Sequence, residues 1–85
     1  MRTLLASVAL LASVTLPAQA DRSVTEAERT RLVPALAAQD CSGGKLEWDD
    51  DDHEFEVDDA QCSDGRTYDL KFNVDYTLKS KKLDD

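Results

Sequence analysis

Residues 46–57 read "LEWDDDDHEFEV" and decide the fold, because two short alternating segments flank a run of aspartates. Alternation of apolar and charged residues is typical of a half-buried β-strand. A two-residue loop at 51–52 would join the segments into a hairpin with its apolar residues on one side. The register then pairs Trp48 with Phe55, Leu46 with Val57 and Lys45 with Asp58.

The other side of this predicted hairpin carries only acids, since Glu47 lies opposite Glu56 and Asp49 lies opposite Glu54. Like charges placed opposite each other destabilise a sheet. Nearby lysines, screening ions or the basic surface of a partner would relieve the repulsion. We therefore predict Glu47, Asp49, Glu54 and Glu56 as partner-binding residues that steer a basic surface.

The run of four aspartates is interpreted as the solvated tip of a hairpin, and this interpretation is favoured over a metal site. The four residues are Asp49, Asp50, Asp51 and Asp52. An EF-hand loop needs glycine at its sixth position, and no frame starting from 47 to 51 supplies one. Consecutive strand side chains also point to opposite faces. Weak binding of divalent cations by these four aspartates stays open as an alternative, and the lone His53 is assigned no role.

The segment that follows predicts a second hairpin. "CSDGR" at 62–66 fits a three-residue loop with Gly65 in the left-handed conformation, so that Cys62 opposes Arg66 and Ala60 opposes Tyr68. Reaching this register from the first hairpin requires one extra residue, a bulge, at 58–59.

The last apolar alternation, from Tyr68 to Leu78, leaves two alternatives open. It predicts either one long strand or two strands joined by a three-residue turn at Asn73–Asp75, because Asn and Asp tolerate left-handed geometry. The turn would pair Phe72 with Tyr76, Leu70 with Leu78 and Asp69 with Lys79.

A helix is predicted over 23–39, where two capping boxes, Ser23 with Glu26 and Thr25 with Glu28, precede a run rich in alanine and leucine. Pro34 should kink the helix or restart it, and the glycines at 43–44 should end it. The predicted fold class is α+β: one N-terminal helix packed on a four-stranded antiparallel meander, with the aromatic residues in the core.

Residues 1–20, "MRTLLASVALLASVTLPAQA", are typical of a cleavable signal peptide with Ala20 at the cleavage site. Residues 21–85 would then form one exported domain, periplasmic or secreted. All 18 acids and nine of the ten basic residues lie there, which leaves a net charge of −9. Such a charge disfavours nucleic acid and anionic lipid as partners.

Cys41 and Cys62 are the only cysteines. Export places them in an oxidising compartment, where a disulfide is expected, and the pair lacks the Cys-x-x-Cys spacing of a zinc site. Closing a loop of this size would stabilise the small domain by about 3 kcal/mol.

Several of these segments together resemble the PepSY family: the leader, the alanine-rich helix, "CSGGK" at 41–45, "FEVDDAQC" at 55–62 and "DGRTYDLKF" at 64–72. The resemblance implies a helix packed on a small antiparallel sheet. It also implies a small exported protein of a Gram-negative bacterium that binds, inhibits or regulates a peptidase acting in trans.

No sequence signature of catalysis is present. The single histidine lies in an acidic loop, and the chain has no glycine-rich phosphate loop, no nucleophile elbow and no redox cysteine pair. We therefore expect a non-enzymatic binding module without a cofactor, with weak divalent-cation binding by a small acidic envelope protein as the alternative function.

Overall fold

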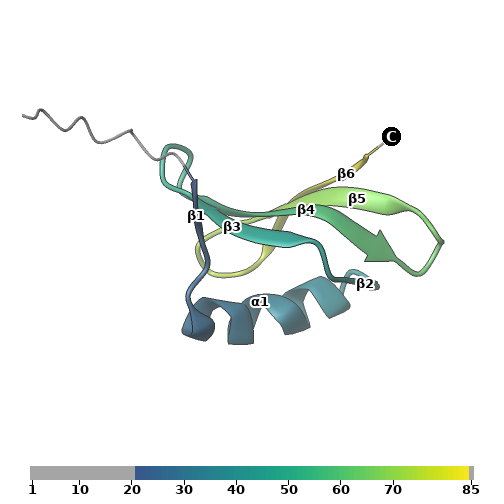
Figure 1. Cartoon of the computed structure of the whole chain (residues 1–85), viewed down its shortest axis with the longest axis horizontal. Helices are drawn as coiled ribbons and strands as arrows, with labels where there is room; N and C mark the ends of the chain where they lie inside the picture. The colour runs from purple at the N-terminus through teal and green to yellow at the C-terminus, as the bar shows by residue number, and fades with distance from the viewer. Residues whose placement is uncertain (1–20, 85) are drawn as a thin grey trace, which may run out of the picture.

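The computed structural model describes residues 21–84, so the predicted signal peptide at 1–20 lies outside the described residues. These described residues form one helix, α1 (Glu26–Ala37), and six strands. The strands are β1 (Asp21–Ser23), β2 (Cys41–Ser42), β3 (Lys45–Asp49), β4 (Glu54–Cys62), β5 (Thr67–Phe72) and β6 (Leu78–Leu83). Every strand pairing is antiparallel, and α1 lies across one face of the sheet (Figure 1). The α+β class is confirmed.

The predicted four-stranded meander is incomplete. Strands β3 to β6 do follow one another across the sheet, but β1 pairs with β3 at one edge and β2 pairs with β4. The helix is therefore not the first element of the domain, because β1 precedes it. Strands of two or three residues carry too little alternation to be visible in a sequence.

The helix begins at the second of the two predicted capping boxes. The Thr25 hydroxyl accepts the Glu28 amide at 3.1 Å, and the Glu28 carboxylate accepts the Thr25 amide at 2.8 Å. Ser23 instead belongs to β1. Pro34 lies within α1 and the helix continues through it, so the alternative of a restart is wrong, whereas the kink stays a prediction. The helix ends at Ala37, before the glycines, and Asp40 takes a left-handed φ of 61°.

The hairpin of β3 and β4 has the predicted register: Lys45 with Asp58, Leu46 with Val57, and Trp48 with Phe55. The predicted bulge is also confirmed, because the register between β4 and β5 shifts between Val57 and Ala60. Asp59 has φ 59° there, and its amide donates to the Asp69 carboxylate at 3.0 Å. Gly44 fits against this bulge with φ 86°, where a Cβ would lie 2.6 Å from the Asp58 carbonyl oxygen.

The last hairpin turns, but not as predicted. Residues 73–77 form a five-residue connection in which Tyr76 has a left-handed φ of 70°. Phe72 therefore opposes Leu78 and not Tyr76, Leu70 opposes Lys81, and Asp69 opposes Lys82. A second irregularity follows, since Lys71 opposes Ser80 and Lys79 is the extra residue. The ring of Tyr76 stacks on that of Phe55, with ring centroids 4.9 Å apart.

The core lies between α1 and the sheet. Leu32 and Leu36 of the helix are buried against side chains from β3, β4 and β5, among them Phe55, Val57, Leu70 and Phe72. Burial of such side chains is the main source of stability in a domain of this size.

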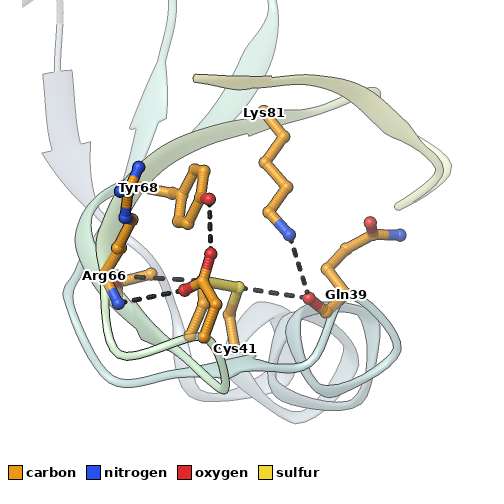
Figure 2. Close-up of a disulfide and its surroundings, with 8 residues drawn as sticks. Gln39, Cys41, Arg66, Tyr68 and Lys81 are labelled. Carbon is orange, nitrogen blue, oxygen red and sulfur yellow. Dashed lines mark hydrogen bonds between the residues drawn. A yellow bond between two sulfur atoms is a disulfide. The ribbon is translucent and has the colours of Figure 1, made fainter. Parts of the chain in front are cut away.

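The predicted disulfide between Cys41 and Cys62 is confirmed and joins β2 to β4. Close by, the Tyr68 hydroxyl donates to Asp64 at 2.6 Å, and Lys81 Nζ donates to the Gln39 carbonyl at 3.3 Å (Figure 2).

Within residues 21–84, no helix is long and apolar enough to cross a membrane.

Candidate partner-binding face of the sheet

Five carboxylates gather on the sheet face that points away from the helix, and we call them the acid face: Asp21, Glu47, Asp49, Glu54 and Glu56. Strand pairing explains the gathering. Asp21 of β1 lies opposite Asp49 of β3, which lies opposite Glu54 of β4. Glu47 lies opposite Glu56 in the neighbouring row, as predicted. The four predicted partner-binding residues are thus brought together, and the structure adds Asp21.

Glu54 is the most deeply placed member of the acid face. It is only 2% exposed, whereas the sequence predicted an exposed outer strand face. Its Oε1 accepts a 2.6 Å hydrogen bond from Lys79 Nζ, and its Oε2 lies 3.4 Å from Lys71 Nζ without an aligned hydrogen bond. Burial alone would raise the pKa of Glu54, but the two lysines hold it below its ordinary value.

Asp49 is also buried, at 8% exposed, which corrects the same prediction. Its Oδ1 accepts the amides of Asp51 and Asp52 at 3.0 and 3.2 Å, so the side chain closes the hairpin turn from inside. Burial opposes ionisation, but the Asp52 amide, the Glu56 carboxyl group and the Asp51 amide together keep the pKa of Asp49 below its ordinary value.

Glu56 behaves in the opposite way. Its partial burial, the hydrogen bond with Asp49, and the charges of Asp49 and Asp21 raise the pKa of Glu56 to about 7. The pKa of Asp21 is also raised, by loss of solvation and by the charges of Glu47 and Asp49. Two neighbouring carboxyl groups do not ionise independently, which is why the pKa of Glu56 is raised while that of Asp49 is lowered.

Lysines compensate only part of the acid face. Lys71 and Lys79 pair with Glu54, and Lys45 pairs with Glu47 at 3.2 Å. Within residues 21–84, no lysine or arginine forms an ion pair with Asp21, Asp49 or Glu56. The side of the acid face next to β1 is therefore short of positive charge.

The aspartates of the hairpin tip do not converge. Asp50, Asp51 and Asp52 are exposed, and Asp50 accepts a hydrogen bond from Trp48 Nε1 at 3.3 Å. The carboxylate oxygens that do lie within 4.8 Å of one another belong to Asp21, Glu47 and Glu56, and to Asp49, Glu54 and Glu56. A third group of three acids, Asp59, Asp69 and Asp84, lies away from the tip.

His53 has a left-handed φ of 52° and packs edge-on against Trp48, with ring centroids 5.5 Å apart. It is exposed and closes the turn before β4 begins. The aromatic residues predicted for the core do lie there or against it, because Phe55 and Phe72 are buried and Trp48, Tyr68 and Tyr76 pack on the cluster.

No protein-family model, curated protein or solved structure matches this chain. The resemblance to the PepSY family therefore rests on short sequence segments alone.

Sequence reasoning missed two contributors to the acid face. Asp21 lies on β1, a strand of only three residues whose sequence shows no periodicity. Lys79 lies on β6, 25 positions after Glu54. Asp21 follows the predicted signal peptide directly, and that position was the only signal in the sequence that could have drawn attention to it.

Proposed function

We propose that this chain is an exported, non-enzymatic binding module of the PepSY type that acts outside the cytoplasm after cleavage following Ala20. It binds a basic surface of a partner protein through the acid face and the exposed hairpin tip at 50–52. A peptidase regulated in trans is the partner that the family resemblance implies.

One observation carries this proposal: the acid face and tip concentrate carboxylates at one end of the sheet with too few lysines to neutralise them. Glu47 and Glu56 are partly exposed, and Asp50, Asp51 and Asp52 are exposed. Among the residues that the structure describes, Asp21 and Glu56 at the same end have no ion pair. A basic surface would complete the missing pairs, and charge complementarity of this kind raises association rates and selects partners.

The test is a pull-down from envelope extract with wild type and with the triple variant Asp50→Asn, Asp51→Asn, Asp52→Asn. Asp49 is left unchanged because it accepts two backbone amides. The control variant carries Glu26→Gln, Asp40→Asn and Asp59→Asn, which removes the same charge from exposed positions elsewhere. Asparagine tolerates the left-handed conformation found at Asp40 and Asp59.

We expect wild type and the control variant to enrich the same partner, and the tip variant to lose most of it. Raising the salt concentration should release the partner, because exposed charges are screened. A peptidase assay on the extract, with and without added protein, then tests the regulatory role. Equal enrichment by all three proteins would refute binding through the tip.

A further inference from the structure

The acid face includes Asp21, the first residue after the predicted cleavage site. β1 places this residue opposite Asp49, and its carboxylate oxygen lies within 4.8 Å of those of Glu47 and Glu56. Among residues 21–84, no lysine or arginine forms an ion pair with Asp21 or Glu56, whereas Glu47 is paired with Lys45 at 3.2 Å. The backbone nitrogen of Asp21 is only two bonds from the Cβ that carries this carboxylate, so a charge placed on it would act at short range on the whole group.

We propose that cleavage after Ala20 completes the acid face, because the new α-ammonium group of Asp21 becomes its built-in counter-ion and fixes β1 against β3. This inference rests on the proposed export and cleavage. In the uncleaved chain the same nitrogen is an uncharged peptide nitrogen. After hydrolysis of the Ala20–Asp21 bond it is a free amine, and an α-amine is mostly protonated at neutral pH.

The position of β1 gives this charge a consequence for the whole domain. β1 is held by only three residue pairs with β3, and Asp21 against Asp49 is one of them. The next residue, Arg22, donates two hydrogen bonds to Glu28 at 2.9 and 3.1 Å, and Glu28 closes the capping box of α1. Stronger pairing of β1 with β3 therefore also stabilises the N-terminus of α1. Cleavage would act as the last step of folding, after export.

Two polypeptides test the proposal directly: residues 21–85 with a free α-amine, and the same chain with an acetylated α-amine. Acetylation removes the charge but keeps a peptide-like N–H, as in the uncleaved chain. We expect the acetylated form to melt on the order of 3 °C lower at neutral pH and low salt, since one surface charge is removed from a small domain. Hydrogen exchange of the amides that pair β1 with β3 should be faster in the acetylated form.

The matched control repeats both measurements in the Glu47→Gln, Glu56→Gln background. There the effect of acetylation should fall by more than half, because the carboxylates that the amine neutralises are gone. An equal loss in both backgrounds, or no loss in either, would overturn the proposal.

Mass spectrometry of the protein isolated from the cell envelope tests the cleavage site, which this inference shares with the proposed function. A chain that begins at Asp21 supports the maturation step, whereas a different N-terminus overturns it. Binding to a basic partner is measured independently by the pull-down.

Discussion

The two faces of the β3–β4 hairpin both bury side chains, but by different physical means. On the helix side, Leu46, Phe55 and Val57 are buried by apolar contacts that need no particular partner atom. On the other side, Glu54 and Asp49 are almost equally buried, and each depends on specific donors: two lysines in one case, two backbone amides in the other. Burial of an apolar group is tolerant of small errors, whereas burial of a charge requires each partner to be in place.

Truncation of a buried side chain on the apolar face should lower the stability of the domain most. Leu70→Ala removes a fully buried side chain and should lower the free energy of unfolding by about 2–5 kcal/mol, the usual cost of such a cavity. Urea denaturation followed by tryptophan fluorescence measures it. Val33→Ala is the control, because Val33 is 49% exposed on α1 and should change stability by less than about 0.5 kcal/mol.

Loss of the disulfide should give the next largest decrease in stability. The disulfide joins β2 to the end of β4 that lies farthest from the hairpin tip. Reduction, or replacement of Cys41 and Cys62 by alanine, should lower the free energy of unfolding by about 3 kcal/mol, because the unfolded chain gains freedom. Calorimetry with and without reductant measures the change. A melting temperature that does not respond to reductant would contradict this account of the small domain.

The acid face should respond to loss of a single donor. Lys79→Met leaves Glu54 Oε1 buried without its 2.6 Å hydrogen bond and should cost about 1–3 kcal/mol of stability. Adding Glu54→Leu should recover most of that loss, because the unpaired buried charge disappears. Lys82→Met, on the same strand, should be nearly neutral. If Lys79→Met is as mild as Lys82→Met, Glu54 does not depend on its partner and the contrast between the two faces fails.

The pH dependence of stability tests the acid face through the titration of its carboxyl groups. Glu56 has a pKa of about 7 in the fold against 4.5 ordinarily, so the fold favours its protonated form. Its contribution to stability is present below about pH 4.5 and is lost as the pH rises through about 7. Glu28 acts in the opposite sense, because Arg22 and the Thr25 amide lower its pKa to about 2 and its contribution is lost in acid.

Melting temperatures between pH 4 and 8 should therefore decline toward the upper end of this range. Glu56→Gln should flatten the decline above pH 4.5 and leave the acid side unchanged. If the melting temperature of Glu56→Gln still declines with rising pH, a titratable group other than Glu56 causes the decline.

The sequence predicted the apolar face residue by residue, because alternation, a short acidic turn and one forced bulge leave few registers in which Trp48 meets Phe55 and Ala60 meets Tyr68. It did not predict the burial of Glu54, since that depends on Lys79, whose position follows from a five-residue turn and a second bulge. It also missed β1 and β2, whose two or three residues show no period. Local pattern determines which face a strand residue takes, and distant partners determine whether a charge there is buried.

The bulge at 58–59 has a consequence for changes in chain length. Between Val57 and Ala60 the strand advances three residues while β5 advances two, from Leu70 to Tyr68. A gene that lost one of these two aspartate codons would encode a strand in which Val57, Ala60 and Cys62 still alternate regularly toward the helix. Loss of Gln61 would instead move Cys62 to the opposite face and away from Cys41. A one-residue deletion at 58–59 would thus remove the bulge and leave each remaining side chain of β4 on its present face of the sheet.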